Sequence, residues 1–250
     1  MKYFVVSDVH SFLTPLKNAL EKANFDINNE QHCLVVCGDL FDRGDESYEL
    51  LKYIMSLPRK ILVRGNHEDL LEECCNRRYA LMRDKTNGTV KTILDIGGYA
   101  NGNTFDTCCE VTLNKTQAYR DSLINYFETK NFIFVHGWIP CRRTSLSNGG
   151  AVFEYTPEWR SCSDSDWEAS RWVNGIDRAQ AGIICPEKTV VCGHWNCSLG
   201  HVYDSEGYSS EFGDNAKWDP WYHKGCIAID RCTAYTNEVN VLVIDDDPLC

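Results

Sequence analysis

Short apolar runs that end at glycine or at polar residues recur along the chain and predict its strands. They cover residues 3–6, 33–37, 60–63, 132–135 and 189–192. Their length and composition are typical of buried strands. Between the first three runs, apolar residues recur at helical spacing, at about 12–23, where Ser11 is a plausible cap, and at about 46–56. Alternating strands and helices predict βαβ units, in which parallel strands bring their carboxyl ends to one edge of a sheet.

Side chains of the kinds that bind metals or transfer protons follow each of these strands. Six of them are oxygen or nitrogen donors: Asp8, His10, Asp39, Asn66, His136 and His194. Such donors suit Mn, Fe or Zn better than a soft metal. Two ions bridged by the central carboxylate, Asp39, would lie ~3.5 to 4 Å apart, close enough to hold a shared hydroxide and two phosphoryl oxygens.

The remaining segments predict covering elements. Residues from about 69 to 130 predict a helical insertion over the site, with a second helix at about 116–128, although a plain spacer is the alternative. The aromatic and acidic segment 197–224 predicts either an irregular loop over the site or a surface excursion. Residues 226–230 and 239–244 predict a hairpin that closes a second sheet. Because no linker or repeat divides the chain, we expect a single domain over residues 1–250.

Composition narrows the function. With 25 basic and 36 acidic residues among 250, the formal net charge is −11, which argues against non-specific nucleic-acid binding. The 14 cysteines lie mostly within apolar runs or beside one another, without a C-x-x-C pair, so we expect reduced thiols. Because the sequence shows no signal-peptide pattern and no apolar run of about 18 residues, we expect a soluble cytoplasmic protein without a membrane partner.

Five ordered motifs carry a family resemblance. They are D-x-H at 8–10, G-D-x-x-D-R-G at 38–44, G-N-H-E at 65–68, V-H-G at 135–137 and G-H at 193–194. In this order they resemble the calcineurin-like metallophosphoesterases, and within them the phosphoprotein phosphatases of bacterial and phage type. The nuclease-like branches have a second His two residues after the G-H motif. This sequence has Asn196 there, and in this respect it resembles the phosphatase branch.

The resemblance implies an α/β fold of four layers, αββα, with two mixed β-sheets packed face to face between helices. It also implies a division of ligands between two divalent metal ions. Asp8 and His10 would hold the first ion, Asp39 would bridge, and the second ion would be held by Asn66, His136 and His194.

Charge suggests roles for the other polar residues. A hydroxide that bridges both metals, formed because the ions lower the pKa of water toward ~7, would attack phosphorus in line. His67 would protonate the leaving alkoxide and Asp42 would orient it. Arg43 would clamp the phosphate oxygens, which Asn66 would also contact. Arg171 is similar in position to a second phosphate-binding arginine of the family; an arginine at the surface or stacked between tryptophans is the alternative.

Several positions beside the motifs differ from the family pattern and bear on the substrate. They are Ser7, Ser11, Trp138, Trp195 and Arg231–Cys232. None removes a predicted ligand or the predicted acid, so these departures concern which phosphate ester is bound rather than the chemistry.

The sequence therefore predicts a manganese-dependent phosphomonoesterase, with Fe or Zn as other candidate metals, acting on phosphoserine and phosphothreonine in proteins or on a small phosphate ester. The motif G-N-H-E after Val63-Arg64 favours this activity, because the similar dinucleoside tetraphosphate hydrolases more often carry G-N-H-D. That hydrolase and a nucleic-acid end-phosphatase are the alternatives. An inactive binding module that docks partners through residues 197–224 is a further one.

Overall fold

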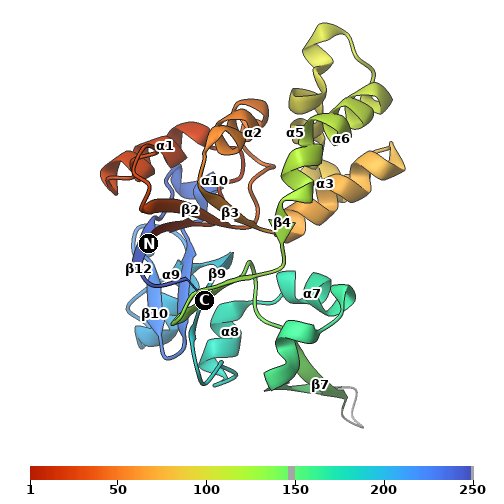
Figure 1. Ribbon diagram of the computed structural model, residues 1–250. Helices are drawn as coiled ribbons and strands as arrows, with labels where there is room; N and C mark the ends of the chain where they lie inside the picture. Colours follow the sequence, from red (N-terminus) through yellow and green to blue (C-terminus); the bar gives the residue numbers. More distant parts are fainter. Residues whose placement is uncertain (146–149, 249–250) are drawn as a thin grey trace.

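The first of two five-stranded sheets carries the N-terminal βαβ units. The computed structural model describes residues 1–145 and 150–248. Four strands run parallel, and β12 joins the edge antiparallel to β1, giving the order β12-β1-β2-β3-β4. The strands are β1 (Lys2–Val6), β2 (His32–Cys37), β3 (Lys60–Val63), β4 (Leu123–Ile124) and β12 (Leu242–Asp245). Helices α1 (Leu13–Lys22) and α2 (Ser47–Ser56) return the chain between the first three strands (Figure 1).

The second sheet is built from the C-terminal half in the order β10-β11-β9-β6-β5. Its central strands β6, β9 and β11 are parallel and its two edge strands are antiparallel. The strands are β5 (Phe127–Glu128), β6 (Phe132–Phe134), β9 (Thr189–Asn196), β10 (Trp221–His223) and β11 (Cys226–Asp230). A separate two-stranded ribbon pairs β7 (Cys141–Ser145) with β8 (Ala151–Tyr155).

Alternation of side chains along the strands divides the core into layers. In β1, Tyr3 and Val5 belong to the cluster between the two sheets, with Phe134 of β6 and Val191 of β9. Phe4 and its alternate neighbours in the first sheet pack instead against α1 and α2. The outer face of the second sheet packs against three helices, α7 (Asp164–Arg171), α8 (Gly175–Gln180) and α9 (Cys197–Asp204). The predicted αββα sandwich is confirmed.

A group of helices follows β3 and stands beside the sheets (Figure 1). It comprises α3 (Asn66–Arg77), α4 (Met82–Thr86), α5 (Thr89–Gly97), a 3-10 turn (Tyr99–Asn101) and α6 (Phe105–Asp121). The second helix predicted for this segment, at about 116–128, is wrong in its bounds. Helix α6 ends at Asp121, and the following apolar residues join sheet edges as β4 and β5, because the ends of both sheets offer them backbone partners.

Two other predictions at the C-terminal end are corrected. The terminal hairpin is wrong, since β11 lies in the second sheet while β12 crosses to the first, where Leu242 and Ile244 join the cluster between the sheets. Segment 197–224 is not wholly irregular, since it begins as α9 and ends as β10. A short 3-10 turn (Pro157–Ser161) and α10 (Thr233–Thr236) complete the elements.

The thirteen cysteines within the described residues are free thiols, most of them buried, as the sequence predicted. Ser11 does not cap α1, because its hydroxyl pairs with Ser47 at 2.8 Å. Among the helices of the described chain, none has both the length and the apolar character needed to cross a membrane.

Candidate metal-centred active site

Site residues in the loops after β1 and β2, and His194 within β9, have an uncommon backbone conformation. Asp8, His10, Asp39, Asp42 and His194 all have positive φ, between 50 and 77°. This left-handed conformation is unfavourable for residues other than glycine, and such residues keep it only where surrounding contacts hold the backbone. Backbone bonds supply those contacts, since the N–H of Asp8 donates to Gly38 and that of His10 donates to Asp39. The predicted site is therefore one tightly coupled set of loops.

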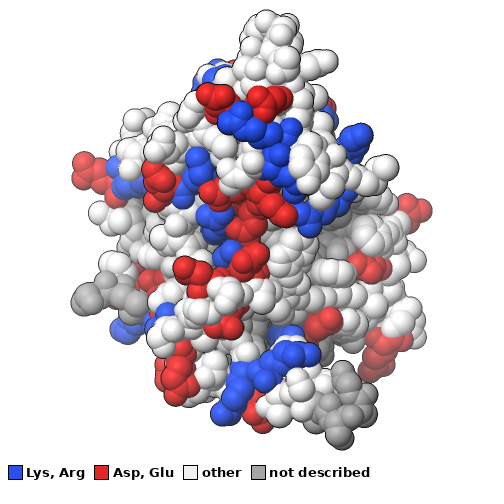
Figure 2. All heavy atoms as spheres, turned by 90° about the vertical axis from the view of Figure 1, so that its right-hand side faces the viewer, with Lys and Arg blue, Asp and Glu red and all other residues white. Residues whose placement is uncertain are grey.

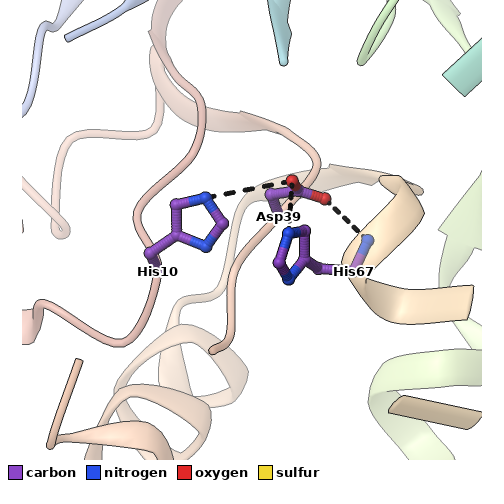
Figure 3. Close-up of side chains that lie close together, drawn as sticks. All are labelled: His10, Asp39 and His67. Carbon is purple, nitrogen blue, oxygen red and sulfur yellow. Dashed lines mark hydrogen bonds and ion pairs between the residues drawn. The ribbon is translucent and has the colours of Figure 1, made fainter. Parts of the chain in front are cut away.

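His10 presents an unpaired nitrogen to the centre of the site. Its Nδ1 lies 2.8 Å from the carbonyl oxygen of Phe41, so Nδ1 carries the proton and Nε2 carries the lone pair. Nε2 is buried without a hydrogen-bond partner among the described residues, 3.9 Å from both Asp8 Oδ1 and Asp39 Oδ2 (Figure 3). Burial and the charge of Arg43 hold the pKa of His10 well below its usual value. A neutral, buried imidazole with a free lone pair can bind a metal ion.

His136 shows the same arrangement on the other side. Its Nδ1 lies 2.9 Å from the carbonyl oxygen of Cys37, while Nε2 lies 2.7 Å from Asn66 Oδ1 and 3.3 Å from Asp39 Oδ1. Burial opposes protonation of the ring, yet the charge of Asp39 raises the pKa of His136 to about 10. A nitrogen that faces two oxygens at these distances requires a positive charge between or on them, which a proton or a metal ion can supply.

Asp39 lies between two groups of candidate ligands. One group joins it to His136 and His194, and the other joins it to His10 and His67; within each group the ligand atoms lie within 4.8 Å of one another. Burial acts to raise the pKa of Asp39, but the charges of His136 and His67 outweigh it and hold the pKa well below its usual value. Asp39 is thus an ionised carboxylate shared by both groups, and its neighbours can hold a divalent metal.

Asp8 and His194 are linked through the backbone. The N–H of His194 donates to Asp8 Oδ2 at 2.9 Å, and the other oxygen of Asp8 faces His10. Burial and the neighbouring His136 lower the pKa of His194 to about 4, so its ring is neutral near pH 7. All six predicted ligands are therefore brought to one place, although the group around His10 includes His67 rather than Asp8.

His67 is held from both ends. Its Nδ1 lies 2.7 Å from Asp42 Oδ2. Its backbone N–H donates to Asp39 Oδ1 at 2.9 Å, and its Nε2 lies 3.8 Å from Asp39 Oδ2 (Figure 3). Burial would lower the pKa of His67, but the charge of Asp39 and the bond to Asp42 raise it. Arg43 is exposed and brings Nη2 to 3.4 Å from His67 Nε2, which leaves this guanidinium at the open side of the site.

Arg171 lies in a network of ion pairs between α7 and α3. Its Nε donates to Asp69 Oδ2 at 2.7 Å and its Nη1 to Asn125 Oδ1 at 3.1 Å. Arg64 binds the other oxygen of Asp69 and also Glu72. Arg64, Asp69 and Arg171 border a cavity of about 680 Å³. Figure 2 shows the face of the molecule that is on the right-hand side of Figure 1. On this face, acidic and basic side chains lie next to one another.

Three supporting residues escaped the sequence analysis. Glu68 accepts hydrogen bonds from the backbone N–H groups of Asp39 at 3.0 Å, Leu40 at 2.9 Å and Gly65 at 2.8 Å, and so ties two of the loops together. Thr89 and Thr92 of α5 donate to the carboxylate of Asp42, which in turn holds His67. Glu68 could have been identified as the last residue of G-N-H-E, whereas the two threonines carry no motif.

Comparisons with known proteins agree with this site. Residues 1–198 match the family model of the calcineurin-like phosphoesterases. A symmetrical bis(5'-nucleosyl)-tetraphosphatase from Pseudomonas fluorescens is 30% identical over 141 residues, which are 56% of this chain and 44% of that protein. The same-named protein of Thioalkalivibrio sulfidiphilus is 44% identical over 69 residues, 27% of this chain and 25% of that protein. The matched regions thus span less than half of these relatives.

Two solved structures share the fold at 16% sequence identity. One, provisionally described as a diadenosine tetraphosphatase, has a TM-score of 0.50 over 97% of this chain and 92% of its own. The other, a cold-active protein-tyrosine phosphatase of a psychrophilic Shewanella, has a TM-score of 0.51 over 98% of this chain and 75% of its own. Because the family model matches residues 1–198, which is most of the chain, the protein belongs to the calcineurin-like phosphoesterases.

Proposed function

We propose that this chain is a dinuclear metal-dependent phosphohydrolase whose first substrate class is the dinucleoside polyphosphates. The unpaired Nε2 of His10, aimed at Asp39, carries the assignment of a metal-dependent reaction, because burying a lone pair without a partner is unfavourable unless a ligand completes it. The substrate class rests on the two relatives described above, both of which are named as symmetrical bis(5'-nucleosyl)-tetraphosphatases.

The candidate ligands would divide between two ions, with Asp39 shared by both. His10 with Asp8 would hold the first, while Asn66, His136 and His194 would hold the second. Divalent ions in such a pair supply Lewis acidity, which makes water nucleophilic near neutral pH and neutralises phosphate oxygens. Manganese suits this mixture of nitrogen and oxygen donors.

His67 supplies the proton to the leaving group. It is a better acid than ligand, because Arg43 lies 3.4 Å from Nε2 and a cation beside that nitrogen disfavours a metal there. Asp42 fixes the ring through Nδ1, so that the Nε2–H of the charged imidazole points into the site. Arg43, exposed beside Nε2, would bind the oxygens of the phosphate, with Asn66 and Arg171 as further contacts.

The helical insertion supports this acid. Thr89 of α5 donates to Asp42 Oδ2 at 2.6 Å, and Thr92, one turn later, donates to Oδ1 at 2.8 Å. Thr92 Oγ1 also accepts the backbone N–H of Asp42 at 3.0 Å. The carboxylate behind His67 therefore depends on a helix that comes from outside the two sheets.

A second candidate is the hydrolysis of phosphoserine and phosphothreonine in proteins. It is favoured by the motif G-N-H-E after Val63-Arg64, in which Glu68 braces the turn between β3 and α3. Arg43 is also exposed, so its guanidinium is accessible to a phosphate on a protein surface.

One experiment separates the two. The kcat/KM of the purified protein would be compared on diadenosine tetraphosphate and on a phosphoserine peptide, with Mn²⁺, Fe²⁺, Zn²⁺ or Mg²⁺ added in turn. We expect metal-dependent turnover with preference for the dinucleotide. A large preference for the peptide would transfer the assignment to the second candidate, and no hydrolysis of either substrate with any metal would refute the proposal.

A further inference from the structure

Two exposed tryptophans lie against one of the candidate metal ligands. Trp172 ends α7 and Trp195 follows His194 in β9, and their side chains are 51% and 40% exposed. The ring centroid of Trp172 lies 6.1 Å from that of His194, and the ring centroid of Trp195 lies 6.2 Å from it, both edge-on. Indole rings of this size are mostly buried, so two exposed ones beside a reacting centre require an explanation.

The other tryptophan beside a family motif behaves differently. Trp138, which follows V-H-G, is 1% exposed and belongs to the core against the outer face of the second sheet. Its place is explained by packing alone. The positions of Trp172 and Trp195 are not explained in this way, because both residues remain exposed to solvent.

We propose that Trp172 and Trp195 form a stacking surface for a nucleobase of the substrate. This inference rests on the proposed function, and it adds the residues that bind the nucleoside. Aromatic rings bind bases by stacking, which contributes for every base because each has a π-face. A base bound beside His194 would lie next to the ligand group that His194 forms with Asp39 and His136, and its polyphosphate would extend from there toward the guanidinium of Arg43 beside His67.

The side chains are free to do this without disturbing the metal site. Trp172 also accepts a hydrogen bond from His194 through its backbone carbonyl, and that bond survives any substitution of the indole. Replacing the ring therefore removes the stacking surface while the link between α7 and His194 is kept. Loss of the ring and loss of the metal ligand can be told apart.

The first test compares substrates with and without a base. Trp172→Ala and Trp195→Ala are each expected to lower kcat/KM on diadenosine tetraphosphate about ten-fold, mainly through KM, and to change hydrolysis of inorganic tripolyphosphate less than two-fold. The Phe variants are expected to recover most of the loss. Tyr79→Ala is the matched control, because Tyr79 is 58% exposed and lies beyond the C-terminal end of the 12-residue α3, about 18 Å from the site end of that helix.

The second test measures binding without turnover. AMP is expected to quench tryptophan fluorescence and to bind at least ten-fold more tightly than ribose 5-phosphate, and both Ala variants are expected to lose this preference. AMP preference without hydrolysis of the dinucleotide would refute the proposed function and leave the stacking surface standing. Hydrolysis with equal binding of AMP and ribose 5-phosphate would refute the stacking surface alone.

Two other results would also refute the assignment of Trp172 and Trp195 as a stacking surface for a base. An equal fall on tripolyphosphate and dinucleotide would make the tryptophans structural supports of His194. A loss confined to phenyl phosphate would assign the rings to an aryl leaving group instead of a base.

Discussion

Replacing Thr92 by valine tests whether the helical insertion supports the site. The two side chains have nearly the same shape, and Thr92 is fully buried, so the change removes a hydroxyl and little else. That hydroxyl donates to Asp42 Oδ1 at 2.8 Å and accepts the N–H of Asp42 at 3.0 Å. Thr92→Val therefore leaves a buried carboxylate oxygen and a buried N–H each without one partner.

The expected loss of stability follows from these two bonds. A hydrogen bond to a charged group contributes about 1.5 to 3 kcal/mol, and an unsatisfied buried N–H costs about 1 to 3 kcal/mol. We expect Thr92→Val to lower the free energy of unfolding by roughly 3 kcal/mol and Tm by about 6 to 12 °C, using about 2 to 4 °C per kcal/mol for a chain of this size. We expect kcat to fall about ten-fold as well, because Asp42 orients His67.

The assay combines thermal unfolding with turnover of an alkyl phosphate, whose poor leaving group needs the acid. Thr112→Val is the matched control, since Thr112 is equally buried in α6 but donates to the carbonyl oxygen of Ile93 at 3.3 Å, with no link to Asp42. The control is expected to lose about 1 kcal/mol and no kcat. A Thr92→Val protein with the Tm and kcat of the control would refute the reasoning.

Three further outcomes are expected. Asp39→Asn should abolish activity and lower bound metal, measured by elemental analysis after dialysis; an unchanged metal content would remove Asp39 as the bridge. His67→Asn should keep its metal and lose rate most on poor leaving groups, so full activity on an alkyl phosphate would contradict its role as acid. Burial acts to raise the pKa of Glu128, but its bonds to Arg160 and Lys188 lower it overall. The contribution of the ionised Glu128 carboxylate to the free energy of unfolding is therefore present above its unfolded pKa of about 4.5. This contribution is lost as the pH falls through the lower pKa of the folded state. Glu128→Gln should flatten this acid limb in unfolding experiments, and an unchanged slope would exclude the ion pairs as its cause.

The sequence indicated which side chains come together at the strand ends, but it did not indicate which residues hold those side chains in place. Asp8, Asp39 and His136 each follow a buried apolar run, and parallel strands necessarily bring such ends together. Thr89 and Thr92 could not be predicted, because their partner Asp42 lies 47 and 50 residues away along the chain and no motif marks them. Contacts of that separation are decided by how α5 packs against α2 and α3.

Very short strands also limited what could be predicted from the sequence. Helical spacing continues past Asp121, yet Leu123 and Phe127 enter two different sheets, because a two-residue strand leaves no periodic pattern. The C-terminal strand was assigned to the wrong sheet for a related reason. Its alternation shows one buried face, which either sheet could accept, and pairing with β1 is settled only by the assembled fold.

That pairing also sets an order in which the fold can be completed. Strand β1 pairs with β12 through Lys2 with Asp245 and Val5 with Leu242, so one of the two neighbours of β1 lies far along the chain and is synthesised long after it. During synthesis the first sheet keeps an open edge until both sheets' other strands exist, and such distant pairing folds slowly. We therefore expect the nascent chain to depend on protection of β1 until its final partner emerges.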